Sequence, residues 1–184
     1  MTENTSSLYG ERIVLRPITD ADTDLIVRWR NNPEVWKNFI FRDKFTPQMH
    51  RKWMQDKVAK GDVVQFIIHE RENDRPIGSV YYRDIDQTNS SAEYGIFIGE
   101  NDARGKGYGT EAARLFVKFG FDTLLLHRIS LRVLADNTQA YKSYEKVGFQ
   151  YEGTAKDMVL LDGVYRDVIF MAILDSSRKT EESN

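Results

Sequence analysis

The sequence predicts a single α/β (α+β) domain with about seven strands and about four helices. A chain of 184 residues is long enough for one domain with a sizeable core. Segments in which apolar residues alternate recur along the chain between segments with apolar residues at helical spacing. The apolar run Ile96-Phe97-Ile98 leads through a glycine-rich loop into an amphipathic helix, and strand–loop–helix order is typical of α/β folds.

Seven segments have the composition of strands. They are residues 13–18, 63–70, 77–84, 93–98, 128–134, 150–161 and 164–174. In the fifth, Ile129, Leu131 and Val133 alternate with polar residues, as expected of a half-buried strand. The last two segments flank Asp162-Gly163, a strong turn signal, and therefore predict a hairpin.

Four segments predict helices. Thr19-Asp20-Ala21-Asp22 opens a helix that runs to about Asn31, before Asn32-Pro33. Thr46-Pro47 starts a second, over residues 47–59. The third follows the glycine-rich loop and reaches about Leu124. The fourth begins at Asp136-Asn137-Thr138 and ends at Gly148, a residue suited to a left-handed cap.

The two ends of the chain are polar or charged. We expect residues 1–8 to be a loose N-terminus, residues 9–174 to form the domain, and residues 175–184 to be a flexible tail. The sequence contains no internal repeat, low-complexity block or second domain boundary.

Composition excludes several functions. A net charge of −2 gives no electrostatic reason to bind nucleic acid. No apolar run is long enough to span a membrane and no signal peptide is visible, so we expect no membrane partner and a cytoplasmic location. The absence of cysteine excludes an active-site thiol. His50, His69 and His127 lie too far apart in sequence to suggest a metal site, so no metal is expected.

The glycine-rich loop Arg104-Gly105-Lys106-Gly107-Tyr108-Gly109-Thr110 suggests a phosphate site. Unpaired N–H groups at a helix N-terminus favour an anion, and glycine lets the backbone approach it closely. The spacing is too tight for a Walker A loop and differs from a dinucleotide-binding Gly-x-Gly-x-x-Gly. A glycine-rich turn without a ligand is the alternative.

Two motifs together resemble the GCN5-related N-acetyltransferase (GNAT) superfamily. Arg104-x-x-Gly107-x-Gly109 is similar to its acetyl-CoA pyrophosphate loop, and the segment from Asn137 through Tyr144 to Phe149 to its second signature. The resemblance implies a mixed sheet splayed between the fourth and fifth predicted strands, acetyl-CoA as cosubstrate, and pantetheine lying in the opening. It assigns the following cofactor-binding residues: Ile96, Phe97, Ile98, Arg104, Gly105, Lys106, Gly107, Tyr108, Gly109, Thr110, Asn137 and Tyr144.

The segment Gly10-Glu11-Arg12-Ile13-Val14-Leu15-Arg16-Pro17 resembles the branch with ribosomal-protein alanine, spermidine and nucleotide-sugar amine acetyltransferases. The expected function is acetyl transfer to the primary amine of a small molecule, such as an amino-sugar nucleotide, by direct attack on the thioester. The alternatives are N-terminal acetylation of a ribosomal protein, acetylation of spermidine or another polyamine, and a non-catalytic acyl-CoA sensor. Analogy with this branch also suggests a homodimer.

Acetyl transfer needs a proton donor for the leaving thiolate and a way to remove a proton from the amine. The resemblance makes Tyr144 the donor, the alternative being a core aromatic residue. Glu93 is the candidate base, with a water chain or a merely structural carboxylate as alternatives.

Residues of the first helix, the segment after it and the third strand are candidates for acceptor binding. They are Trp29, Arg30, Asn31, Trp36, Phe39 and Tyr82. The alternative for each aromatic residue is ordinary packing. Between Arg28 and Lys44 cationic residues outnumber carboxylates, which argues against a polyamine acceptor.

Overall fold

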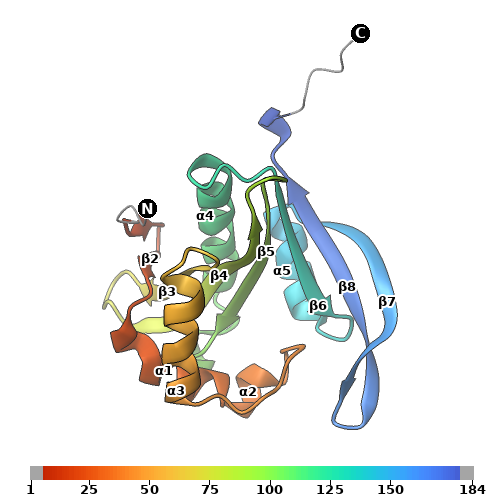
Figure 1. Cartoon of the computed structure of the whole chain (residues 1–184), viewed down its shortest axis with the longest axis horizontal. Helices are drawn as coiled ribbons and strands as arrows, with labels where there is room; N and C mark the ends of the chain where they lie inside the picture. The colour runs from red at the N-terminus through yellow and green to blue at the C-terminus, as the bar shows by residue number, and fades with distance from the viewer. Residues whose placement is uncertain (1–5, 179–184) are drawn as a thin grey trace.

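A computed structural model describes residues 6–178 as one open eight-stranded sheet with helices on both faces (Figure 1). The strand order is β1-β2-β3-β4-β5-β6-β8-β7. The strands are β1 Leu8–Tyr9, β2 Ile13–Pro17, β3 Val64–Glu70, β4 Pro76–Asp86, β5 Ser91–Ile98, β6 Arg128–Leu134, β7 Gln150–Leu161 and β8 Val164–Leu174. Within the described chain, β5 and β6 are the one parallel pair, so the sheet is mixed as expected.

The described residues form five α-helices, one more than expected. They are α1 Thr23–Arg30, α2 Pro33–Trp36, α3 Pro47–Trp53, α4 Tyr108–Asp122 and α5 Thr138–Val147. The additional helix is α2, where Asn32 accepts a hydrogen bond from the Glu34 N–H and caps a short turn that begins at Pro33. The chain after α3 continues as a π-helical turn, Met54–Val58.

The sheet opens between β5 and β6, which confirms the expected splay. These strands pair only at Ser91, Ala92 and Glu93, although β5 runs on to Ile98 and β6 to Leu134. Figure 1 shows the two strands separating toward the end that faces α2. The facing edges of the sheet are therefore left without a strand partner beyond Glu93.

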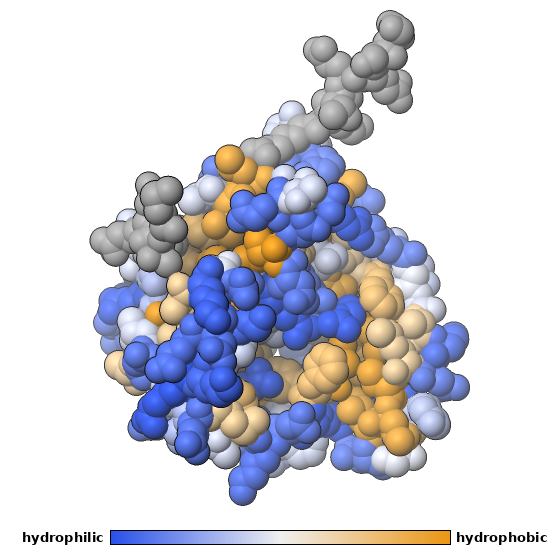
Figure 2. All heavy atoms as spheres, in the orientation of Figure 1, coloured by the Kyte–Doolittle hydropathy of each residue, from blue (hydrophilic) through white to orange (hydrophobic). Residues whose placement is uncertain are grey.

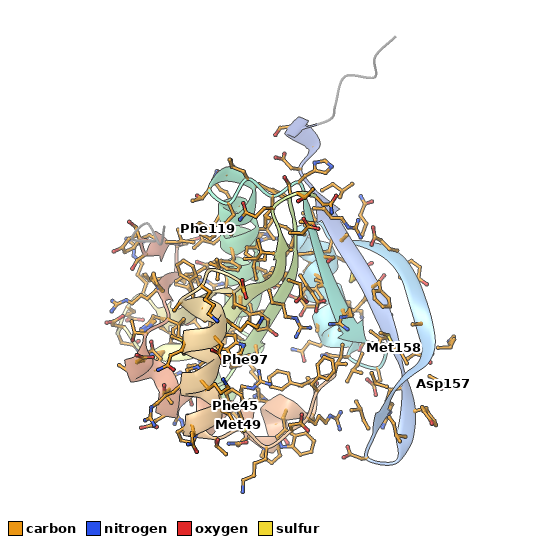
Figure 3. All side chains as sticks on the ribbon, viewed as in Figure 1. Phe45, Met49, Phe97, Phe119, Asp157 and Met158 are labelled. Atoms are coloured by element: carbon orange, nitrogen blue, oxygen red, sulfur yellow. The ribbon has the colours of Figure 1, made fainter. Side chains whose placement is uncertain are left out.

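Two cores lie on opposite faces of the sheet. On one face α4 buries Phe116 and Phe119, whose rings lie 5.5 Å from that of Phe66. On the other face Trp29 of α1 packs edge-on against Phe97 of β5, at 6.1 Å. In Figure 3 the labelled Phe97 lies beside α3 and Phe119 on α4. Neighbouring residues of a central strand therefore serve different cores: Phe66 and Ile68 of β3 belong to one, and Ile67 to the other.

The ends of the domain differ partly from expectation. Leu8, expected to be loose, pairs with Leu15 in β1–β2 and packs against the core because its side chain is apolar. In the expected tail, Ser176–Arg178 form a 3-10 turn in which the Ser177 N–H bonds to Asp175. Residues 1–5 and 179–184 of these expected segments lie outside the described residues.

An apolar surface lies on the β7–β8 hairpin, at the lower right of Figure 2. It includes Met158, Leu160 and Val164, each of which is exposed. Among the helices of residues 6–178, none has the length and apolar character needed to cross a membrane.

Candidate active site

The opening between β5 and β6 leads into a cavity of about 520 Å³. One end is lined by the glycine-rich loop and the start of α4, the other by residues 38–41 and the exposed face of β4. Figure 2 shows the molecule hollowed near the centre of this face, between the α3 side and the β7–β8 hairpin. The cavity therefore joins the expected cofactor loop to two of the expected acceptor residues, Arg30 and Phe39.

The loop has the backbone shape of an anion site. Gly105 and Gly107 have φ values of 73° and 85°, in the left-handed region that favours glycine. Gly107 is the N-cap of α4, and no side chain caps the free N–H groups of its first turn. A Cβ at Gly105 would meet nothing within 4 Å. These features fit a diphosphate bound to the N-terminus of α4.

Two arginines hold this loop in place. Arg104 donates to the carbonyl of Ile98 at 3.2 Å and to that of Glu34 at 3.0 Å, while its second Nη is buried without a partner among the described residues. Arg12 donates to the carbonyl of Lys106 at 3.0 Å and pairs with Glu111 of α4. The predicted residue Lys106 itself does not line the cavity. Sequence reasoning missed Arg12 because it is far from the loop in the chain and has no local signal.

The walls beyond the loop suit an extended chain that carries amides. Ile96, Phe97 and Ile98 of β5 line the cavity, as do Tyr108, Gly109 and Thr110. Because the inner edges of β5 and β6 are unpaired there, their N–H and C=O groups are available to such a ligand. The hydroxyl of Tyr94, also in the wall, is buried with no partner in the described structure. An orphaned polar atom of this kind is explained by a missing partner.

Helix α5 places both predicted signature residues in the cavity wall. Asn137 is the N-cap, and its side-chain oxygen accepts from the Ala140 N–H at 3.2 Å, which leaves its amide nitrogen available. The ring of Tyr144 packs edge-on against Tyr94 at 6.2 Å and contacts Phe149. Burial, and then the nearby Tyr81 phenol, raise the pKa of Tyr144. Tyr144 therefore stays protonated at neutral pH, as a proton donor must.

Glu93 lies where the strands begin to separate, but its oxygens already have partners. Oε1 accepts from Arg83 Nη2 at 2.5 Å and from Arg132 Nε and Nη2 at 3.2 and 3.1 Å. Oε2 lies 3.0 Å from Arg132 Nη2. A carboxylate has about four lone-pair sites, so few remain for an incoming amine. The geometry favours a positioning role for Glu93, because it holds two guanidinium groups in the cavity wall.

Of the six predicted acceptor residues, only Arg30 and Phe39 line the cavity. Trp29 is 1% exposed, and its indole donates to Glu100. Asn31 bonds through its side chain to the backbone of Phe45. The Trp36 ring lies beneath Arg42.

Tyr82 is completely buried on the opposite face of the sheet, where its hydroxyl donates to the Phe116 carbonyl at 2.9 Å. It is therefore a core residue, because odd and even positions of β4 face opposite sides. Its neighbour Tyr81 lines the cavity instead, with Arg83, Arg132 and Phe41. The alternation of residues 77–84 predicted that successive side chains lie on opposite faces of the sheet. It did not predict which face lines the cavity.

A sheet split beside a glycine-rich helix N-terminus, with the half-buried Tyr144 in the same cavity, defines an acyltransferase of the GNAT fold. Residues 12–150 match the family model described as acetyltransferase (GNAT) domain. The chain belongs to this family and is an N-acetyltransferase, as the resemblance implied.

Individual relatives agree with this assignment. The chain is 32% identical over 171 residues to an uncharacterized N-acetyltransferase, p20, of Bacillus licheniformis, which covers 91% of this chain and 96% of the relative. It is 28% identical over 161 residues to spermidine N(1)-acetyltransferase of Escherichia coli, covering 88% and 85%. A crystal structure of spermidine N-acetyltransferase from Vibrio cholerae, in complex with CoA and spermine, superposes with a TM-score of 0.84 at 25% identity, covering 90% of this chain and 96% of that one.

Proposed function

We propose that this enzyme transfers the acetyl group of acetyl-CoA to the primary amine of a small molecule. The observation that carries the proposal is one continuous cavity that runs from the phosphate-type loop past Tyr144 to a cationic end. Bound acetyl-CoA supplies an activated thioester. The protein has then to align the amine with it and manage two protons.

Residues of the cavity are suited to these tasks. The loop and the open edges of β5 and β6 bind and orient the cofactor, and Asn137 donates from its free amide nitrogen. The protonated phenol of Tyr144 donates a proton to the departing thiolate. An ordered water removes the proton of the amine, while Glu93 fixes the arginines around it. A direct base role for Glu93 remains the alternative.

A polyamine is the second candidate acceptor, and the spermidine acetyltransferases among the relatives favour it. The positive charge of the cavity argues against a polyamine acceptor. Arg30, Arg83 and Arg132 line the acceptor end, and Glu93 is the sole carboxylate among the described residues that line this cavity. A polyamine carries several positive charges, and like charges at short range repel. We therefore favour an amine that also carries negative charge, as an amino-sugar nucleotide does.

Two other functions are alternatives that the experiment below also tests. A protein N-terminus is an alternative acceptor, and a non-catalytic acyl-CoA sensor is an alternative to an enzyme. The free Asn137 amide and the protonated Tyr144 favour catalysis over a sensor. A homodimer stays a prediction by analogy with the branch.

The test is thiol release from acetyl-CoA with a panel of amines that includes amino-sugar nucleotides, spermidine and peptides with free N-termini. We expect turnover with small amines, and Tyr144→Phe to lower kcat about 100-fold while changing acetyl-CoA affinity little. Tyr141→Phe, on the same helix but outside the cavity, is the matched control. Binding of acetyl-CoA without turnover of any amine would favour the sensor. Unchanged kcat in Tyr144→Phe would remove Tyr144 from the donor role.

A further inference from the structure

A second cavity of about 460 Å³ lies beside the first, bounded by α1, α3 and one face of β3 and β4. The two cavities share a wall, made of Arg30, Phe41, Tyr81, Arg83 and Phe97. Phe45, which is labelled near Phe97 in Figure 3, belongs to the second cavity. A ligand that fills the second cavity therefore lies next to the acceptor end of the first.

Three nitrogen atoms in the wall of this second cavity are buried without a hydrogen-bond partner in the described structure. They are Nε of Arg30, Nε2 of His50 and Nε of Arg83. A buried donor without a partner costs about 1–3 kcal/mol, so native proteins contain few of them. Three such nitrogens around one cavity are an observation that a bound ligand would explain.

Arg30 is the strongest of these three groups. Its guanidinium carbon lies 5.0 Å from the centroid of the Phe39 ring and 4.7 Å from that of Phe45. No carboxylate among the described residues lies within ion-pair distance of it. Burial lowers the pKa of Arg30. The two rings contribute cation–π contacts but no hydrogen-bond acceptor in the ring plane, so the N–H groups of Arg30 still need acceptors.

The remaining charges of this cavity compensate one another. Lys57 pairs with Asp62 at 3.3 Å, and Asp84 lies 3.8 Å from Arg83. His50 is 1% exposed, and its Nδ1 lies 3.0 Å from the hydroxyl of Thr23. When that hydroxyl donates to Nδ1, the proton of the imidazole is on Nε2, which becomes a donor. Lys57 and Arg83 are thus paired with carboxylates, and the charge of this cavity that stays uncompensated is that of Arg30.

We propose that this second cavity binds a carboxylate or phosphate group through Arg30, His50 and Arg83. We further infer that the group belongs to the amine acceptor, at the end away from the reacting nitrogen. This second step rests on the proposed function. It follows from the shared wall, because a molecule that extends from Arg30 past Tyr81 reaches the cavity that contains Tyr144.

The binding test does not depend on knowing the acceptor. The Tm of protein saturated with CoA is measured by differential scanning calorimetry at increasing concentrations of inorganic phosphate or succinate. Potassium chloride of equal ionic strength is the control. We expect at least one of the two anions to raise Tm saturably, by mass action on the folded state. The anion that does so distinguishes a phosphate from a carboxylate site. If neither raises Tm more than chloride, the proposal is overturned.

Variants separate this site from the glycine-rich loop. Arg30→Gln is expected to weaken anion binding by about tenfold or more. Arg51→Gln, on α3, removes the same charge near His50 without touching either cavity, and should bind as the wild type does. If Arg30→Gln does not fold, Arg30→Lys keeps the charge but loses the planar fork, and should also weaken binding. An anion response that survives both Arg30 variants belongs to another site and contradicts the proposal.

A turnover test addresses the acceptor. Amines are compared in pairs that differ by one anionic group: ethanolamine with O-phosphoethanolamine, glucosamine with glucosamine 6-phosphate, and butylamine with 4-aminobutanoate. We expect the anionic member of at least one pair to have about tenfold higher kcat/KM, and Arg30→Gln to abolish that preference. Turnover without any such preference would overturn the acceptor assignment. Anion binding without turnover of any amine would instead remove the proposed function and leave the anion site.

Discussion

The phenol ring of Tyr81 lies over Gly95, its Cα partner on the neighbouring strand β5. A Cβ on Gly95 would be 2.3 Å from Cζ of Tyr81 and 2.4 Å from its Oη. Because residue 95 has no side chain, the ring fits at the junction of the two cavities. It is also close enough to Tyr144 to add to the effect of burial in raising the pKa of that phenol.

Gly95→Ala should therefore impair catalysis more than folding. The new methyl group must displace the Tyr81 ring, whose tip borders open cavity and can move. We expect kcat/KM to fall about 100-fold, as small misplacements in active sites do. We expect unfolding free energy to fall by about 1 kcal/mol, at the low end for overpacking. Urea denaturation and steady-state kinetics measure the two effects, and wild-type activity in the variant would show that the Tyr81 position is unimportant.

Tyr81 and Tyr82 should behave oppositely when their hydroxyls are removed. Tyr82→Phe loses the buried bond to the Phe116 carbonyl, so we expect about 1 kcal/mol less stability and unchanged kcat/KM. Tyr81→Phe should keep its stability and lose activity or acceptor affinity. Each variant is the control for the other. A lower kcat/KM in Tyr82→Phe would support the original prediction that Tyr82 takes part in acceptor binding.

Glu93→Gln separates a positioning role from a base. If Glu93 positions Arg83 and Arg132, the variant keeps a kcat within about tenfold of wild type and its pH profile keeps its shape, while the KM for the acceptor changes. If Glu93 is the base, kcat falls by about 100-fold or more and activity recovers at higher pH, where the amine loses its proton without help. The pH dependence of kcat for both proteins decides between the two.

Binding of the cofactor should depend on Gly107 but not on Gly61. Both residues have positive φ, 85° and 79°, so alanine at either costs about 1–2 kcal/mol of backbone strain. Gly107 caps α4 in the loop, whereas a Cβ at Gly61 meets nothing within 4 Å. Calorimetric titration with acetyl-CoA should show weaker binding in Gly107→Ala, by about tenfold or more, and wild-type binding in Gly61→Ala. Equal affinities would argue against phosphate binding at this loop.

Stability should fall in mild acid because of His50. Burial, and then the charge of Arg30, lower the pKa of the folded His50 imidazole. The unfolded chain takes up a proton below about pH 6.5, while folded His50 resists it, so the unfolded state binds more protons there. The contribution of neutral His50 is thus complete above that pH and is lost as the pH falls.

His50→Gln should therefore show a smaller loss of unfolding free energy than wild type between about pH 7.5 and 5.5. Urea midpoints at several pH values for both proteins give the comparison. Carboxylates contribute equally to both proteins, so the difference isolates His50. Parallel pH dependence in the two proteins would contradict a lowered pKa.

Local signals were sufficient for much of the fold. The strands 128–134, 150–161 and 164–174 have the bounds that the sequence predicts, because alternation and the Asp162-Gly163 turn act between near neighbours. Gly148 caps α5 with a φ of 114°, as its position after an amphipathic helix indicates. Strand β1 was missed because two residues carry too little pattern, and it exists only by pairing with β2.

The candidate site divides in the same way. The glycine-rich start of α4 and the Asn137 cap of α5 could be predicted because backbone shape and helix capping are set by a few consecutive residues, while the roles of these residues and of Tyr144 stay predictions. Other contacts depend on residues brought together from distant parts of the chain. They are the hydrogen bonds of Arg83 and Arg132 to Glu93, the bond of Arg12 to the Lys106 carbonyl, and the burial of Tyr82 beside Phe116, which leaves Tyr81 at the cavity. The second cavity has no sequence signal, since its unsatisfied nitrogens come from α1, α3 and β4 and become buried only when these elements pack. The sequence thus determined the family and the glycine-rich loop at the start of α4, and tertiary packing alone decided which charges line the cavity.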